Sequence, residues 1–162
     1  MTGETIVFGI LAGVAATATM DVLGGAFRRV GLAAGAKGQW VGRWYLGIPR
    51  GQFVHSNIAL APELPGEKQT ALIGHYLIGI ALAVFYIAGA GWVGVPPDGF
   101  LLALGYGFLP TDFPRFLLLL ALGSGAFALK GPPALKPLTT SLLTHLPYGL
   151  RHWLNVKLLP LR

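Results

Sequence analysis

The feature that most constrains the fold is a series of long apolar runs that contain very few charges. The first run covers residues 6–27 and carries one charged residue, Asp21. Later runs cover residues 71–93, 100–129 and 138–159. About 20 apolar residues are enough for a helix to cross the hydrocarbon core of a bilayer. The pattern therefore predicts an all-α, polytopic membrane protein, a bundle of about four transmembrane helices that forms one domain over residues 1–162.

The low charge content favours a lipid environment over water. Charged residues make up only 11% of the chain, whereas a soluble domain carries about 25%. The net charge is +6, but the bases gather at the ends of the apolar runs and form no basic helix face. We therefore expect contacts with anionic lipids and no nucleic-acid binding. The chain has no cysteine, which excludes disulfides and thiolate chemistry.

A stripe of mostly small residues marks the first apolar run as a packing helix. Its members recur every fourth residue, so they share one helix face, and small residues let a neighbouring backbone approach closely; the stripe consists of Gly9, Gly13, Thr17 and Gly25, with Asp21 in the same register. Asp21 has two interpretations. It is either an interfacial acid paired with Arg28 or with a base of another helix, or a buried functional acid, since intramembrane carboxylates are costly.

The third run is too long for one straight span, and two prolines divide it. Pro110 and Pro114 each remove a backbone donor and clash with the preceding turn, so we predict a kink near residues 110–114. Asp112 and Arg115 flank this break. They form either a self-satisfied ion pair beside the kink or a polar site at a discontinuous helix.

The long connection after the first span, residues 28–70, is the most polar part of the chain. Its aromatic and basic side chains are typical of a membrane interface, where rings lie at headgroup depth; the predicted anchors are Arg28, Arg29, Trp40, Arg43, Trp44 and Tyr45. Residues 39–48 could form a short helix on the membrane, and prolines make the rest an irregular but defined loop. The apolar stretch 53–60 is expected to dock against the protein.

The distribution of bases predicts the orientation. The first connection and the turn around Lys130 and Lys136 are basic, whereas the N-terminus and the second turn have no base. The positive-inside rule therefore places loop 28–70 in the cytoplasm and both termini on the other side. The bases near the C-terminus argue the other way.

The histidines are the main candidates for a polar site. His55, His75, His145 and His152 are spread over the connection and two spans, without a close ligand motif such as HxxxH. A pair across helices could bind haem or a divalent metal, with Asp21 as a further ligand, but we expect no metal and no cofactor. No GxSxG elbow or Walker loop is present, so no catalytic residue is assigned. The approach of His55 and His75 to Asp21 is the first place to look for a site.

Several short motifs resemble one known family. They are GRW at residues 42–44, PRGxF at 49–53, GE at 66–67, GHY at 74–76, TMD at 19–21 and LLTH at 142–145. Together they resemble the small bacterial inner-membrane family catalogued as domain of unknown function 2938, with PTDFPRF as the main departure. The resemblance implies a four-span fold in the inner membrane and little about chemistry. In that membrane, the distribution of bases places both termini in the periplasm.

The sequence favours a protein that is not an enzyme. We expect an accessory subunit, scaffold or assembly partner of a larger membrane complex, in contact with other membrane subunits or with copies of itself. One alternative is an intramembrane enzyme or a metal-, haem- or lipid-binding protein. Its polar cluster would draw on Asp21, His75, His145 and Arg151. A second alternative is an oligomeric transporter of small solutes.

Overall fold

The chain is mainly helical in the part that the computed structural model describes. The described residues are 2–32, 37–113, 117–125, 130 and 135–158, and at 109–113, 135–139 and 141 the backbone alone is described. Six α-helices and two short 3-10 helices follow one another: α1 (Gly3–Arg29), α2 (Gly38–Gly47), η1 (Ile48–Arg50), η2 (Ile58–Leu60), α3 (Glu67–Val93), α4 (Phe100–Phe113), α5 (Leu119–Ala121) and α6 (Leu135–Leu158). No strand occurs among these residues. The predicted all-α class is confirmed.

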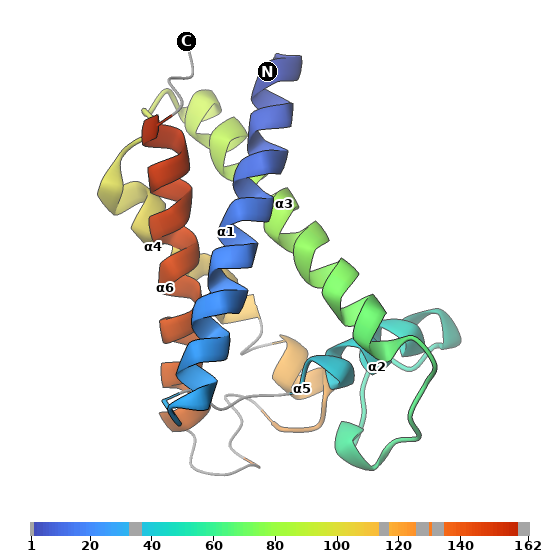
Figure 1. Ribbon diagram of the computed structural model, residues 1–162. Coiled ribbons are helices and arrows are strands. Elements are labelled where there is room, and N and C mark those ends of the chain that lie inside the picture. The colour runs from blue at the N-terminus through green and yellow to red at the C-terminus, as the bar shows by residue number, and fades with distance from the viewer. Residues whose placement is uncertain (1, 33–36, 114–116, 126–129, 131–134, 159–162) are drawn as a thin grey trace.

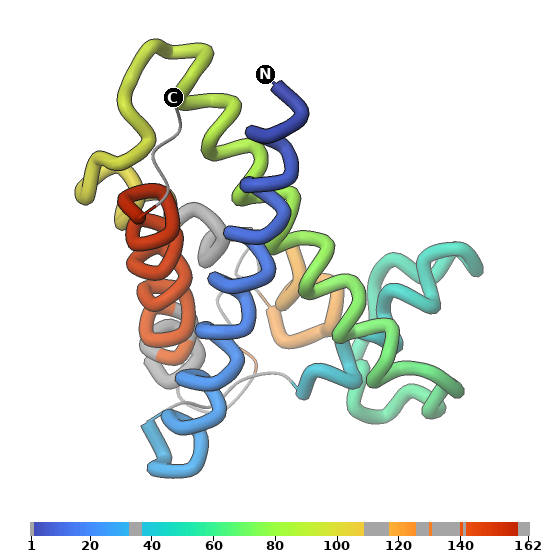
Figure 2. The backbone as a smooth tube through the Cα atoms, turned by 45° about the horizontal axis from the view of Figure 1, so that its top comes forward, coloured from blue at the N-terminus to red at the C-terminus, as the bar shows by residue number. Residues whose placement is uncertain are grey.

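The helices α1, α3, α4 and α6 form a bundle with two distinct ends (Figure 1). The first turn of α1, the last turn of α3, the start of α4 and the last turn of α6 lie at one end. The last turn of α1, the first turn of α3, α2 and α5 lie toward the other end. In a second view α2 again lies beside the start of α3 and away from α6 (Figure 2). The connection between α1 and α3 is therefore a folded unit at one end of the bundle.

Local sequence signals explain where the two longest helices begin and end. The Thr2 side chain accepts a hydrogen bond from the Thr5 amide and caps α1, whose last turn carries Arg28 and Arg29. Cations at a helix C-terminus interact favourably with the helix dipole. Gly94 ends α3 in the left-handed region, with φ of 75°, a conformation that glycine adopts without steric cost.

Among the described residues, two helices are long and apolar enough to cross a membrane. These are α1 and α3, with 27 residues each. Helix α4 ends at Phe113 after 14 residues, and α6 has 24 residues of more polar sequence. Length and composition alone therefore support two of the four expected spans, α1 and α3. Both of the other apolar runs contain a helix that packs in the same bundle.

The small-residue stripe of α1 lies against α3. A Cβ atom on Gly13 would lie 2.6 Å from the Ile80 Cα atom, and one on Gly79 would lie 2.0 Å from Thr17 Oγ1. The Thr17 hydroxyl donates to the Gly13 carbonyl at 2.8 Å, so it is satisfied within its own helix. At Gly25 the same test finds no neighbour within 4 Å. The two backbones therefore touch along the first half of the stripe and separate near its end.

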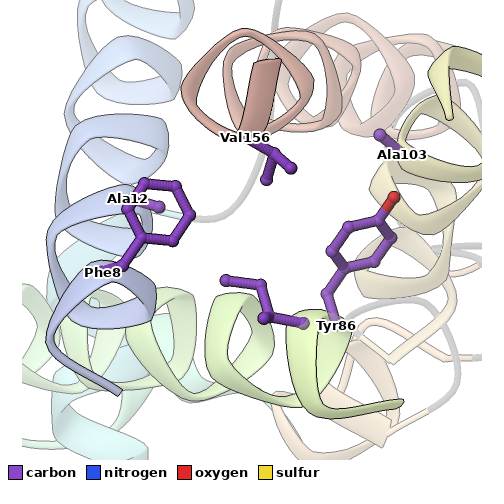
Figure 3. Packing of buried hydrophobic residues seen from close by; sticks show 6 residues of the cluster. Phe8, Ala12, Tyr86, Ala103 and Val156 are labelled. Carbon is purple, nitrogen blue, oxygen red and sulfur yellow. The ribbon is translucent and has the colours of Figure 1, made fainter. Parts of the chain in front are cut away.

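Side chains from four helices meet at the centre of the bundle. Figure 3 shows them pointing toward one another; the cluster comprises Phe8, Ala12, Tyr86, Ile87, Ala103 and Val156. Tyrosine hydroxyls around it donate to backbone carbonyls: Tyr106 to Leu82 at 2.8 Å and Tyr148 to Gly79 at 2.7 Å. Carbonyls within a helix retain a second lone pair for such bonds. The bundle interior satisfies these hydroxyls without solvent.

The contact between α1 and α3 can be tested with a pair of alanine substitutions. Gly13→Ala places a methyl group against the α3 backbone, and we expect it to lower the free energy of unfolding by about 1–3 kcal/mol. Gly25→Ala enters open space, and we expect no loss, since alanine favours a helix over glycine by up to about 1 kcal/mol. Unfolding of the detergent-solubilised protein, followed by tryptophan fluorescence, measures both values. Equal effects of the two substitutions would contradict the close approach.

Candidate functional site

The start of α3 meets α2 at a point where only glycine fits. A Cβ atom on Gly42 would lie 1.8 Å from the Glu67 carbonyl oxygen. Glu67 is the first residue of α3, and Gly66 before it has φ of 84°. The absence of a side chain at Gly42 lets the two backbones touch. The next residue of α2, Arg43, is thereby brought beside the Glu67 carboxylate.

Arg43 and Glu67 form a buried ion pair that holds the connection together. Arg43 Nη2 donates to Glu67 Oε2 at 3.0 Å and its Nε donates to Oε1, while the residues are only 3% and 6% exposed. Arg43 Nη1 also donates to the carbonyls of Ile58 and Ala61, and Glu67 accepts from the Leu64 amide. The hydrogen bond with Glu67 outweighs desolvation and raises the pKa of Arg43 above its usual value. One guanidinium thus joins α2, η2 and α3.

This pairing corrects the sequence-based interpretation of Arg43. The prediction that Arg43 anchors the chain to lipid headgroups is wrong, because its guanidinium is buried and fully engaged by the protein. The neighbouring rings also make internal contacts. Trp44 Nε1 donates to the Phe53 carbonyl at 2.8 Å, and a Cβ atom on Gly74 would lie 2.6 Å from the Tyr45 ring.

The other predicted anchors lie nearer the surface. Arg28 and Arg29 are exposed at the end of α1. Lys37 places its ammonium 5.6 Å from the centre of the Trp40 ring, within the range of a cation–π contact. Their contact with lipid remains a prediction.

A cavity of about 380 Å³ opens beside the ion pair. Nine residues of the connection line it: Arg43, Arg50, Gln52, Val54, His55, Ser56, Ala61, Pro62 and Leu64. Two of these are arginines, and none is an aspartate or glutamate. The charge of Arg43 is balanced by Glu67, whereas Arg50 is exposed and has no acidic partner among the described residues. The lining therefore includes one guanidinium, that of Arg50, without an acidic partner among the described residues.

The turn after α5 closes one side of the connection. The His55 amide donates to the Ala121 carbonyl at 2.8 Å, and the Ile58 amide donates to the Leu122 carbonyl at 3.0 Å. His55 Nε2 is buried and lacks a hydrogen-bond partner among the described residues. Buried polar atoms are almost always satisfied by protein, water or an ion. His55 thus belongs to the wall of the cavity and not to a cluster with Asp21.

Asp21 and His75 meet at the interface of α1 and α3. Asp21 Oδ1 lies 3.1 Å from His75 Nε2, and the two side chains are 44% and 37% exposed. Of the proposed polar cluster, this is the pair that the structure brings within hydrogen-bonding distance among the described residues. Its partial exposure keeps the strength of the pairing below about 1 kcal/mol in water.

The remaining candidates are dispersed. His145 lies beside the Thr144 hydroxyl on α6, with Nδ1 at 3.3 Å from Oγ1, and Arg151 has a buried Nε without a partner among the described residues. His152 is 1% exposed and packs edge-on against Tyr86, with ring centres 4.6 Å apart. The Asp112 side chain and Arg115 lie outside the described residues. No group of three or more potential ligands converges on a metal site in the part of the chain that the structure describes.

The residues that shape the connection stand in the short motifs that resemble a known family: Gly42 and Arg43 in GRW, and Glu67 in GE. A comparison with family models identifies the same family. Residues 10–158 match the model of a family described as proteins of unknown function, DUF2938. The chain belongs to the DUF2938 family. The resemblance inferred from the motifs is confirmed over nearly the whole sequence. No curated protein and no solved structure matches the chain.

Sequence reasoning missed the two residues that organise this site, Gly42 and Glu67. Both stand in motifs that it had identified, GRW and GE, but their roles depend on the helix contact. One signal was present. Glu67 is an acid at the start of an apolar run, and a carboxylate near a membrane span needs a partner.

The ion pair can be tested against a neighbouring exposed acid. Glu67→Gln leaves the Arg43 charge buried and unpaired, and we expect a loss of about 3–5 kcal/mol in the free energy of unfolding. Glu63→Gln is the matched control, because Glu63 is 82% exposed and 3.7 Å from Arg43 Nη2, and we expect a change of at most about 1 kcal/mol. Hydrogen exchange of residues 42–67 locates the effect. If residues 42–67 were as protected from hydrogen exchange in Glu67→Gln as in Glu63→Gln, the role of the pair would be contradicted.

Proposed function

We propose that this DUF2938 protein is a multi-pass protein of the bacterial inner membrane that serves as an accessory subunit or scaffold in a membrane complex. Its connection between α1 and α3 would present a folded surface on the cytoplasmic side. The observation that carries this proposal is the buried Arg43–Glu67 pair, which gives the connection one defined shape. The membrane location and the role as a subunit rest on separate arguments.

The outer faces of α1 and α3 support a membrane location. In their most apolar stretches only 33% and 22% of the residues are buried within the protein, whereas the core helix of a soluble protein is mostly buried. Large apolar side chains lie exposed along both helices, including Val7, Leu11, Val22, Ile73, Leu77 and Phe85. Each helix has 27 residues, about 40 Å at 1.5 Å per residue. Acyl chains would cover these faces.

The arrangement of the helix ends supports four crossings. The start of α1 and the end of α6 lie at the same end of the bundle (Figure 1), as an even number of crossings requires. The segment that contains α4 and α5 would supply the third crossing. The basic residues Arg28, Arg29 and Arg50 belong to the end that carries α2. Positive residues favour the cytoplasmic side, which sets the proposed orientation.

The construction of the connection supports a role in assembly. A segment that only joined two spans would need no buried ion pair and no glycine at a backbone contact. Long connections that keep a defined structure in compact domains are usually functional, and rigidly held loops are common recognition surfaces. The connection also clamps the turn after α5 through two backbone hydrogen bonds. A partner would thus meet a preformed surface built from two distant parts of the chain.

The topology can be tested by cysteine labelling, because the natural chain contains no cysteine. We expect Thr2→Cys and Asp98→Cys to react with a membrane-impermeant maleimide in cells whose outer membrane is permeable. Gln69→Cys should react only after the inner membrane is opened. Leu11→Cys, on the exposed face of α1, should react only after denaturation. Fast labelling of Leu11→Cys would contradict a membrane span, and labelling of Gln69→Cys in intact cells would invert the orientation.

The role as a subunit can be tested by gentle purification in detergent. We expect the wild-type protein to elute in a particle that contains a second chain, or a further copy of itself, in fixed ratio. Glu67→Gln should lose this partner, because the connection loses its shape, while Glu63→Gln should retain it. Protein mass within the micelle, measured by light scattering, distinguishes the states. A wild-type particle with one 17.1 kDa chain would overturn the proposal.

A further inference from the structure

The cavity in the connection has the donor set of an anion site. Arg50 contributes a guanidinium, and Gln52 and Ser56 contribute an amide and a hydroxyl. None of these three side chains has a hydrogen-bond partner among the described residues, in contrast to Arg43. A guanidinium fork matches the oxygens of a phosphate and can donate two parallel hydrogen bonds. The free donors and the unpaired guanidinium of Arg50 point to an oxyanion.

The backbone around Arg50 holds this donor in place. Arg50 ends the short helix η1, which begins at Ile48 and includes Pro49. Gly51 follows in the left-handed region, with φ of 75°, and the Gln52 amide donates back to the Gly47 carbonyl at 3.0 Å. The turn between α2 and the loop is therefore closed by its own hydrogen bonds. Arg50 and Gln52 project from one ordered turn.

The surroundings of the cavity are apolar and uncovered. Phe53, Val54 and Leu60 are 59%, 73% and 83% exposed, and Val54 also lines the cavity. The indole of Trp44 fixes the Phe53 carbonyl by a hydrogen bond. Exposed apolar side chains beside a cationic cavity are typical of a surface at the boundary between headgroups and acyl chains. A soluble anion would leave these side chains in water.

We infer that this cavity binds the phosphate of an anionic phospholipid headgroup, with Arg50 as the principal ligand. The apolar side chains around the cavity would then lie against the acyl chains of the same lipid. The choice of a lipid as the source of the phosphate rests on the proposed membrane location. The phosphate site itself rests on the donors and charge of the cavity alone.

Glu63 allows a second test of the site, with an effect on binding opposite to that of Arg50. Its carboxylate is 82% exposed and lies 3.7 Å from Arg43 Nη2, in the segment that forms one wall of the cavity. A bound phosphate would be repelled by this charge. Removal of the charge should therefore strengthen binding, whereas removal of Arg50 should weaken it.

Native mass spectrometry of the full chain in detergent can measure this binding. The delipidated protein is titrated with short-chain phosphatidylglycerol, with phosphatidylcholine of the same chain length and with inorganic phosphate. We expect one phosphatidylglycerol to bind saturably, and Arg50→Gln to weaken it on the order of tenfold, the effect of one charged hydrogen bond. Arg50→Lys should keep part of the affinity, since it retains charge without the fork. Glu63→Gln should tighten binding by roughly twofold to fivefold, as expected for one nearby exposed charge.

The control is Lys157→Gln, which removes an exposed base in the last turn of α6 that does not line the cavity. We expect phosphatidylglycerol affinity within a factor of about two of the wild type, the range of an exposed charge. Equal losses for Arg50→Gln and Lys157→Gln, or equal binding of phosphatidylcholine, would overturn the site.

The inorganic phosphate titration separates the two sources of the ligand. Arg50-dependent binding of inorganic phosphate as tight as that of phosphatidylglycerol would overturn the lipid as the source. Arg50-dependent phosphate binding in a protein whose α1 labels freely from water would uphold the cavity and refute the membrane location.

Discussion

The connection depends on one requirement: a buried guanidinium must have a buried carboxylate beside it. Withdrawal of an ion from water costs several kcal/mol, and a partner with good geometry and further hydrogen bonds is needed to offset that cost. Arg43 meets the requirement through Glu67 and two loop carbonyls. Because those contacts come from three residues of the connection, Ile58, Ala61 and Glu67, its path is defined from α2 to α3. The cavity is a consequence of that path.

The bundle follows a related rule for its backbone. Helices α1 and α3 touch through Gly13 and Gly79, and tyrosine hydroxyls reach carbonyls on neighbouring helices. In an apolar environment helices associate through close packing and such hydrogen bonds, because burial of apolar side chains gives little advantage there. The same construction leaves large apolar side chains on the outside. Both features are those expected for the proposed membrane location.

The two clusters of polar residues have different positions in this scheme. Asp21 and His75 lie at the α1–α3 contact, near the end where the helices separate. Arg50, His55 and Ser56 line a cavity that the connection alone builds. The sequence predicted that His55 and His75 both approach Asp21. In the structure His75 contacts Asp21 between α1 and α3, whereas His55 lines the cavity. The second is the better place for a small molecule, because it offers both volume and free donors.

Periodicity and composition predicted the helices, their apolar character and the packing stripe of α1, and short motifs indicated the family, because each of these is a local property of the chain. A four-residue repeat places Gly9, Gly13 and Thr17 on one face whatever else the chain does. The partner of Arg43 could not be predicted in the same way. Glu67 lies 24 residues away, and the pair forms only because Gly42 lets α2 touch the start of α3. Tertiary structure decided that Arg43 is neutralised inside the connection and that Arg50 lines the cavity without an acidic partner among the described residues.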